Sequence, residues 1–434
     1  MAKVSRLWRR LGLTSPLFNV WSEEDSEFQM TDHHIKAITI TRGSANGTFG
    51  EQEHTLEVNS AVVRHVRTDR PIHCDLTSSG RDRLQSIIGG DGDNYRRRFF
   101  GRIGRQSVED GGGISTDRKW HTNIYASKWQ SQLKNSDRVG NQIDGEPVMY
   151  LFDHFMRPTV SNLPYLPDPE FPSNSWEYGT MLNNLDLGQA KITYSEFSSR
   201  YFEAPGFYVQ NTRAGADRVL TIQRRWDLAQ YRLESFIPLT RSQVLAPALW
   251  DQPNENRPRN HTVIYKNVSG DWLRRTRGPD TNDVRIPLVE HDISYIGFPS
   301  IHQPTQMLEA RYAQDRTDTG YQLPTVEVDL LRLITSGNQS DRQQARQLLE
   351  LEMGDPIYLS GDWATNIRGI HFASGVTEKI TPDSWTLTLS LQPSISVIGY
   401  WSPTVPARVW DSAHVWWDNA TSQWNERFSY TEGN

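Results

Sequence analysis

The fold is indicated first by Trp385-Thr386-Leu387-Thr388-Leu389-Ser390-Leu391, followed by Gln392-Pro393. Large apolar residues alternate strictly with hydroxyl-bearing residues, so the hydrophobic period is two. This period places every apolar side chain on one face of a strand and leaves the opposite face to solvent. The stretch therefore predicts a half-buried strand of a β-sheet.

The same period occurs near the N-terminus. Ile38 and Ile40 alternate with threonines, and Leu56 and Val58 alternate with polar residues. Turn signals around Gly43 separate the two stretches. We predict that short antiparallel strands form a small β-barrel or sandwich near the N-terminus and a second β domain near the C-terminus.

Length and composition predict several domains rather than one. The chain has 434 residues, of which 36% are hydrophobic and 11% aromatic. A single core stops growing at roughly 250–300 residues. We predict an α+β, β-rich fold with these parts: an N-terminal arm (1–33), a first β-barrel domain (34–110), an α+β domain (111–245), a second α+β or insertion region (246–324), a helical segment (325–353), a second β-barrel domain (354–400) and a Trp-rich C-terminal tail (401–434).

Helix signals are clearest in residues 325–353. Ser340 and Gln343 have the spacing of a capping box, and Gly354 can provide a left-handed stop. A shorter helix is predicted for Tyr125–Leu133.

The charge balance argues against a dedicated duplex-DNA-binding protein. The chain carries 46 Lys and Arg against 52 Asp and Glu, a net charge of −6. Arg96-Arg97-Arg98 and Arg274-Arg275 are only local clusters. We interpret both as solvated strand ends or subunit contacts.

Carboxylates at Asp283, Glu290 and Asp292 raise the possibility of a glycosidase pair. All three fall in predicted strands, Asp283–Val289 and His291–Ile296, where alternating charges usually face solvent. We therefore interpret them as surface residues and predict no enzyme activity.

No residue pattern predicts a cofactor or a metal ion. His33-His34 and His291-Asp292 contain suitable ligand types without the spacing of a known site. Asp91-Gly92-Asp93-Asn94 resembles half of a calcium loop but is interpreted as a tight turn. Cys74 is the only cysteine, which excludes an intrachain disulfide.

Three stretches, in this order, resemble the hub family of phage tails. This family includes the baseplate hub of contractile phages and the minor tail proteins of long-tailed phages of actinobacteria. The stretches are Ile38–Gly43 with Glu53–Asn59 and Arg98–Ile103, then Leu348–Ile357, then Arg368–His371 with Ile380–Pro393.

The resemblance implies a structural role in the virion tail tip. It implies a homotrimer whose barrels form a ring around the tail channel and connect the distal tail protein ring to the tip. The tape-measure protein and receptor-binding proteins are further expected partners, with DNA present only in transit. No insertion into a membrane is expected, because no window approaches the roughly 18 apolar residues of a spanning helix, and assembly is expected in the host cytoplasm.

The C-terminal tail also resembles those of minor tail proteins. Trp410, Trp417 and Trp424 recur at steps of seven, with Trp416 adjacent. Ser, Thr and Asn between them are poor helix formers, which favours a Trp-rich hairpin or docking peptide over a coiled coil. These four tryptophans are our candidate partner-docking residues.

The sequence also allows two other functions. Exposed Trp and Tyr side chains would also suit a module that binds host cell-surface polysaccharide. A peptidoglycan-degrading tail enzyme is the third hypothesis.

Overall fold

The structure is a computed structural model. It describes residues 10–22, 24, 28–31, 34–43, 53–60, 66–68, 70–110, 120–127, 137–139, 169–170, 183–184, 191–193, 207–211, 220–224, 236–245, 260–267, 269–278, 282–298, 304–305, 308, 325–360, 363 and 369–393. Within these ranges the fold is β-rich, as predicted. No helix in them has both the length and the apolar character needed to cross a membrane.

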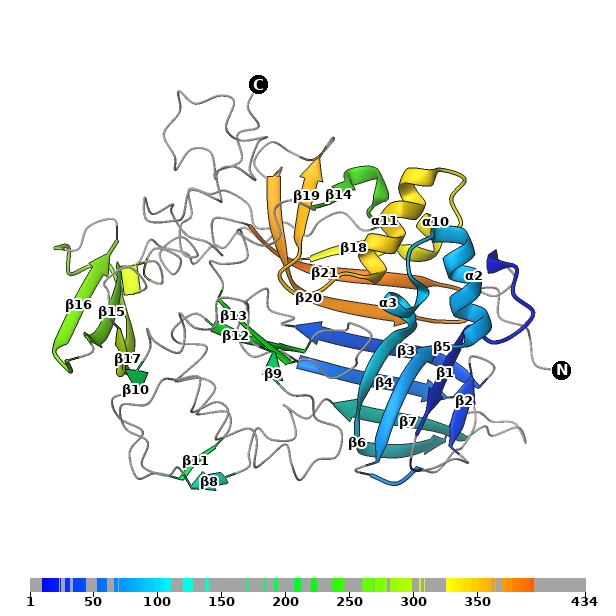
Figure 1. Ribbon diagram of the computed structural model, residues 1–434, viewed down its shortest axis with the longest axis horizontal. Coiled ribbons are helices and arrows are strands. Elements are labelled where there is room, and N and C mark those ends of the chain that lie inside the picture. Colours follow the sequence, from blue (N-terminus) through cyan, green and yellow to red (C-terminus); the bar gives the residue numbers. More distant parts are fainter. Residues whose placement is uncertain are drawn as a thin grey trace.

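Strands from both ends of the chain form one twelve-stranded sheet (Figure 1). Its main path runs β14-β19-β20-β3-β4-β7-β6-β5-β1-β2, and β21 pairs with both β20 and β18. The strands are β1 (Phe18–Trp21), β2 (Gln29–Thr31), β3 (Ile35–Gly43), β4 (Glu53–Ser60), β5 (Pro71–Leu76), β6 (Arg97–Asp110), β7 (Trp120–Ser127), β14 (Ile237–Thr240), β18 (Thr325–Asp329), β19 (Pro356–Ser360), β20 (Gly369–Ile380) and β21 (Trp385–Pro393).

The long strand β20 joins the two ends of the chain. One of its edges pairs with β21, and the other pairs with β19 over its first half and with β3 over its second. The β3 pairing runs antiparallel from Gly43 opposite Gly375 to Ile38 opposite Ile380. The two predicted barrels are therefore not separate, because their strands share a sheet that is not closed into barrels in the described part of the chain.

Five short helices accompany the sheet. Within the described part of the chain, these are α2 (Ser78–Ile88), α3 (Gly92–Arg96), the 3-10 helix η3 (Arg241–Gln243), α10 (Leu330–Ile334) and α11 (Gln339–Leu349). In Figure 1 α2, α10 and α11 lie together on one side of the sheet. Helix α2 was not predicted, since residues 34–110 were interpreted as strands alone.

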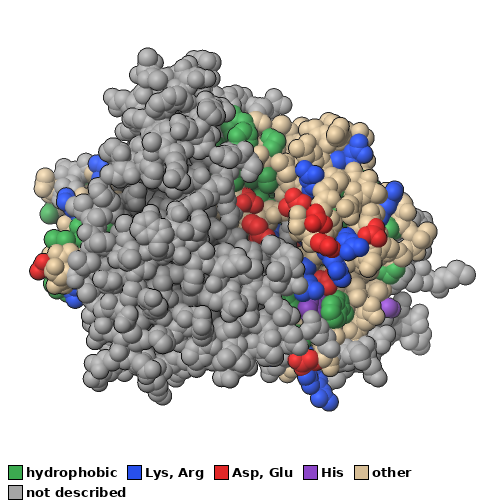
Figure 2. Space-filling model, viewed as in Figure 1, with side chains coloured by type: hydrophobic (Ala, Val, Ile, Leu, Met, Phe, Trp, Pro, Cys, Tyr) green, Lys and Arg blue, Asp and Glu red, His purple; other side chains and the backbone are tan. Residues whose placement is uncertain are grey.

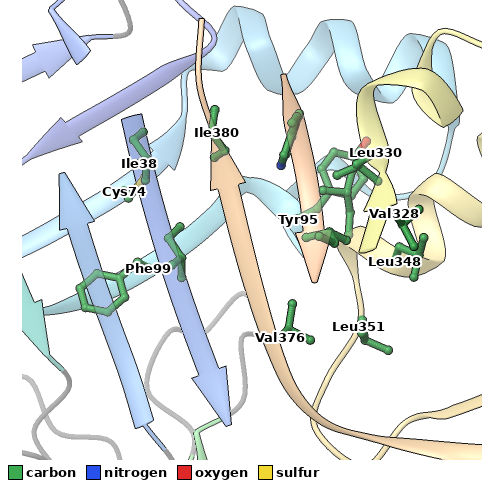
Figure 3. Packing of buried hydrophobic residues seen from close by; sticks show 14 of the residues in the cluster. Ile38, Cys74, Tyr95, Phe99, Val328, Leu330, Leu348, Leu351, Val376 and Ile380 are labelled. Carbon is green, nitrogen blue, oxygen red and sulfur yellow. The ribbon is translucent and has the colours of Figure 1, made fainter. Parts of the chain in front are cut away.

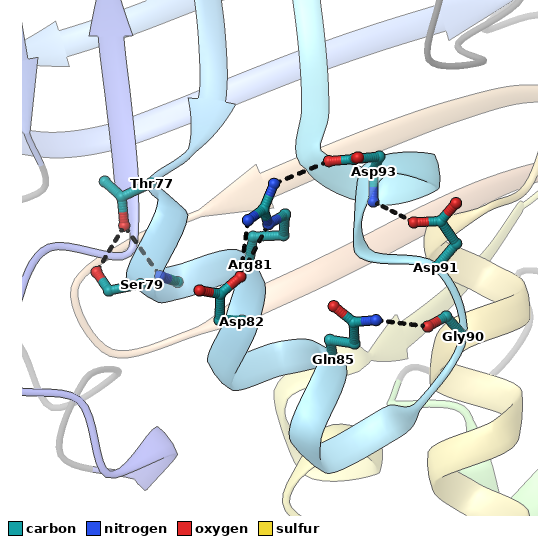
Figure 4. Close-up of polar contacts among 9 residues, drawn as sticks. Thr77, Ser79, Arg81, Asp82, Gln85, Gly90, Asp91 and Asp93 are labelled. Atoms are coloured by element: carbon teal, nitrogen blue, oxygen red, sulfur yellow. Dashed lines mark hydrogen bonds and ion pairs between the residues drawn. The ribbon is translucent and has the colours of Figure 1, made fainter.

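Polar side chains fix the start of α2 and its contact with α3 (Figure 4). The Thr77 hydroxyl oxygen accepts a hydrogen bond from the Gly80 N–H at 3.1 Å, which caps the helix. Arg81 donates to the carboxylates of Asp82 at 2.9 Å and Asp93 at 3.0 Å. The predicted tight turn at Asp91 is the N-cap of α3.

One hydrophobic core lies between the helices and the sheet (Figure 3). Phe99 of β6, Leu348 of α11 and Ile380 of β20 are all buried in it. The predicted N-terminal arm also contributes, because Phe18 and Val20 of β1 are fully buried. Its residues 10–22 and 28–31 thus belong to the folded body.

The described residues between 137 and 298 form three smaller sheets. The largest has four strands in the order β10-β17-β15-β16. Their bounds are β10 (Asn183–Asn184), β15 (Asn260–Asn267), β16 (Trp272–Arg277) and β17 (Leu288–Phe298), and the other strands are β8 (Asp137–Val139), β9 (Pro169–Glu170), β11 (Lys191–Thr193), β12 (Phe207–Asn211) and β13 (Leu220–Arg224).

Several predicted elements differ from the structure. Tyr125 lies in strand β7, so a helix over Tyr125–Leu133 is wrong for its described part. The predicted helical segment contains β18, α10 and α11, and Asn338 rather than Ser340 caps α11. Strand β17 begins at Leu288, so Asp283 lies before it.

Gly43, the last residue of β3, occupies a position that admits no side chain. Its φ of 76° lies in the left-handed region that favours glycine. An added Cβ would collide with the carbonyl oxygen of Ser374, the Sδ atom of Met353 and the Cα atom of Gly375. The pairing of β3 with β20 therefore depends on glycine at this position.

We expect Gly43→Ala to lower the free energy of unfolding by more than about 2 kcal/mol, because it combines left-handed backbone strain with overpacking. Gly270→Ala isolates the backbone contribution, since Gly270 has a φ of 87° and no atom within 4 Å of an added Cβ. Gly270→Ala is expected to lower the free energy of unfolding by about 1–2 kcal/mol. Gly337→Ala has neither feature and should change stability by less than about 0.5 kcal/mol. Urea unfolding followed by circular dichroism ranks the three variants, and equal losses for Gly43→Ala and Gly270→Ala would contradict the steric argument.

Candidate functional site

A buried ion pair joins distant parts of the main sheet. Arg98 lies in β6 and Glu378 lies in β20, and their side chains are 0% and 1% exposed. The prediction that Arg96-Arg97-Arg98 is a solvated or intersubunit cluster is therefore wrong for Arg98. The side chain turns into the core instead of toward solvent.

The geometry of the pair satisfies both charges. Arg98 Nη2 lies 2.6 Å from Glu378 Oε2, and Arg98 Nε lies 3.1 Å from each carboxylate oxygen. Arg98 Nη1 donates to the backbone oxygen of Leu349, at the end of α11, at 3.0 Å. Trp385 Nε1 donates to Glu378 Oε1 at 2.8 Å. One polar cluster thus connects β6, α11, β20 and β21.

Arg42 of β3 adds a second buried cation to this region. Its Nη1 donates to the backbone oxygen of Leu351 at 3.1 Å and lies 3.8 Å from the Glu352 carboxylate. Burial lowers the pKa of Arg42, and the positive charge of Arg98 acts in the same direction, whereas Glu352 opposes the shift. We call Arg42, Arg98, Glu352 and Glu378 the polar junction.

The strand period could have identified Glu378 as an inward-facing residue. Val376 and Ile380 of the same strand are buried, and residues two apart on a strand share a face. Glu378 also pairs across the sheet with Leu387 and Ile40, which are both buried. An acidic residue at such a position signals a buried cation, although the sequence alone does not say which arginine supplies it.

A second polar cluster lies at the β1–β5–β6 end of the sheet. Asp75 of β5 accepts hydrogen bonds from Trp21 Nε1 at 2.9 Å and from Arg97 Nε at 2.9 Å. Burial raises the pKa of Asp75, and the nearby Arg97 and the Trp21 hydrogen bond oppose this shift without cancelling it. The cluster ties the N-terminal strand to the sheet.

The catalytic and metal-binding candidates named in the sequence analysis do not form one site in the structure. Glu290 pairs with Arg274, Asp283 pairs with Arg285, and Asp292 accepts a hydrogen bond from the backbone N–H two residues on. His291 Nε2 lies 3.0 Å from His261 Nδ1, with the two rings stacked. Among the described residues no group of three or more His, Cys, Asp or Glu is arranged to hold a metal ion.

The remaining candidates are placed as follows. Cys74 is buried in β5. His33 lies outside the described residues, as do Trp410, Trp416, Trp417 and Trp424. Partner docking by the four tryptophans stays a prediction.

The fold of the chain is similar to that of two solved tail proteins. One is the tail protein from Neisseria meningitidis MC58, with a TM-score of 0.56 and 13% identity over 88% of this chain and 98% of that one. The other is the 43 kDa tail protein of prophage MuSo2 from Shewanella oneidensis, with a TM-score of 0.51 and 9% identity over 89% of this chain and 99% of that one. No protein-family model and no curated protein matches the sequence.

These likenesses concern the fold, and they extend over almost the whole of both tail proteins. The expected relation to phage tail proteins is thus confirmed at the level of fold. The narrower resemblance to minor tail proteins of actinobacterial phages stays a prediction.

The polar junction predicts a strong energetic coupling. Glu378→Gln should lower the free energy of unfolding by about 3–5 kcal/mol, because it leaves the Arg98 charge buried without a counter-charge. Adding Arg98→Met to Glu378→Gln removes that charge while Gln can still accept from Trp385. The loss in free energy of unfolding should therefore be smaller for the double variant than the sum of the losses for the two single variants. Urea unfolding in a double-mutant cycle measures this difference.

The exposed pair Arg274–Glu290 provides the matched control, since its side chains are 55% and 51% exposed. Glu290→Gln should cost less than about 1 kcal/mol. Simple additivity at Arg98 and Glu378 would show that the two side chains do not stabilise one another.

The raised pKa of Asp75 predicts a pH dependence. The folded protein binds the Asp75 proton more tightly than the unfolded chain, whose value is 3.8. The stability of the wild type relative to Asp75→Asn should therefore fall as the pH rises from below 3.8, and become constant above the folded-state pKa. Urea unfolding of both proteins across this range measures the difference, and a rise with pH would refute the assignment.

Proposed function

We propose that the protein is a structural subunit of a phage tail. More specifically, it is a trimeric hub at the tail tip that connects the distal tail ring to the tip and receptor-binding proteins around the tail channel. The observation that carries this proposal is the fold likeness, which spans 98% and 99% of two tail proteins. The order of the hub-like sequence stretches supports the finer role.

The architecture of the subunit suits a rigid structural component. Strands from both ends of the chain share one sheet, and the polar junction fixes β6, β20, β21 and α11 to one another. A subunit held together by these contacts keeps its conformation when other tail proteins bind to its surface. The proposed role is therefore assembly rather than catalysis.

The visible charge pattern suits contacts with other proteins. On the face shown in Figure 2, basic and acidic side chains of the described residues lie interspersed over the helical side of the sheet. Ion pairs of this kind include Arg81 with Asp82 and with Asp93. A nucleic-acid interface would instead gather basic side chains on one face. The proposed tape-measure and tail-ring partners are proteins, which agrees with this pattern.

The test combines native mass with location. Light scattering of the purified chain should give three times 49.9 kDa. A tagged chain should appear at the tail tip in electron micrographs of the particles, in three copies per tail. Any other copy number in the particle would overturn the trimer, and absence of the tag from the tail would overturn the structural role.

A further inference from the structure

Strand β16 is an open edge of the four-stranded sheet. Within the described part of the chain it pairs with β15 alone, and all six of its residues are exposed. Figure 1 shows it at the periphery of the molecule, away from the main sheet. Free edges of this kind pair readily with another extended chain.

Backbone N–H and C=O groups of β16 point outward, where a further strand could pair with them. At the hairpin turn Asn267 N–H donates to the Asp271 oxygen at 3.1 Å, which makes this a hydrogen-bonded pair. Bonded and non-bonded pairs alternate along an antiparallel ladder. The N–H and C=O groups of Trp272, Arg274 and Thr276 therefore point away from β15. The register continues from Lys266–Trp272 to His261–Arg277 without a bulge, so the edge is regular.

The edge strand itself carries two exposed apolar side chains. Trp272 is 63% exposed and Leu273 is 41% exposed, and as neighbours on a strand they lie on opposite faces of the sheet. Both faces of an added strand would thus find apolar contacts.

The edge is also strongly basic. Its sequence, Trp-Leu-Arg-Arg-Thr-Arg, has three cations and no carboxylate, in a chain whose net charge is −6. Lys266 of β15 adds a fourth cation and lies over the Trp272 ring at 4.7 Å from its centroid. Arg274 is paired with Glu290, whereas Arg275 is exposed on the opposite face. Like charges discourage two such edges from pairing with one another, and they favour an acidic partner.

We propose that β16 is the docking edge for an extended acidic segment of another protein, which adds to the sheet as a fifth strand. The row of outward backbone groups matches a polypeptide, which can return both N–H and C=O hydrogen bonds. A nucleic acid or a glycan would use the arginines or Trp272 but would leave that row unmatched. The proposal concerns this surface and holds whether or not the chain is trimeric.

The probe is a fluorescent acidic peptide of alternating Glu and Val residues, titrated with the full-length protein and followed by anisotropy. Arg275→Glu combined with Arg277→Glu should weaken binding at least tenfold, because it reverses the charge of the edge. Thr276→Pro should weaken it similarly without a change of charge, because it removes an outward N–H. Arg105→Glu is the matched control, an exposed strand arginine of the main sheet, and should bind as the wild type does.

Circular dichroism identifies variants that have lost the fold, and only folded variants are compared. Failure of the wild type to bind the peptide would overturn the proposal. So would binding that survives both changes at β16. Tighter binding of an oligothymidine or of a cell-wall polysaccharide than of the peptide would assign the edge to a different class of ligand and would also overturn it.

Discussion

The structure depends on the buried pair of Arg98 and Glu378. Removing two charges from water is costly, and the cost is offset only where geometry and further hydrogen bonds are good. Here the carboxylate also accepts from Trp385, and the guanidinium also donates to the Leu349 carbonyl. Each hydrogen bond comes from a different element, so the pair is satisfied only when β6, α11, β20 and β21 are all in place. It therefore specifies the arrangement of the sheet as well as contributing to its stability.

The fold is shared with tail proteins at 9% and 13% identity, so few individual residues are needed to specify it. Alternating apolar positions fill one side of each strand, and many residue choices meet this need. Positions such as Gly43 are more restricted, because two backbones approach there without room for a Cβ. Arg98 and Glu378 are also restricted, because each needs the other's charge in the buried core.

The sequence predicted the elements whose signal is local. Strict alternation identified β21, β3 and β4, and the start and stop signals in residues 325–353 identified α11. It failed where the decisive contact is distant, because β3 pairs with β20 more than 300 residues away and the two were assigned to separate barrels. Arg98 was misread because it belongs to a run of three arginines, two of which remain partly exposed. The position of Glu378, two residues from buried Val376 and Ile380, was a usable signal for a buried charge. Arg274-Arg275 was interpreted as a solvated strand end or a subunit contact, but the sequence did not show that their strand, β16, has an open edge.

The pairing of β3 with β20 has a consequence for synthesis. A ribosome adds about 5–20 residues per second, so β3 emerges on the order of tens of seconds before its partner strand exists. During that interval one edge of β3 has no β20 to pair with, and the Arg98 side chain has no Glu378. The sheet therefore cannot be completed at this edge of β3 until β20 is made. Until then the unpaired edge of β3 is open to pairing with other chains, which is a route to aggregation during translation.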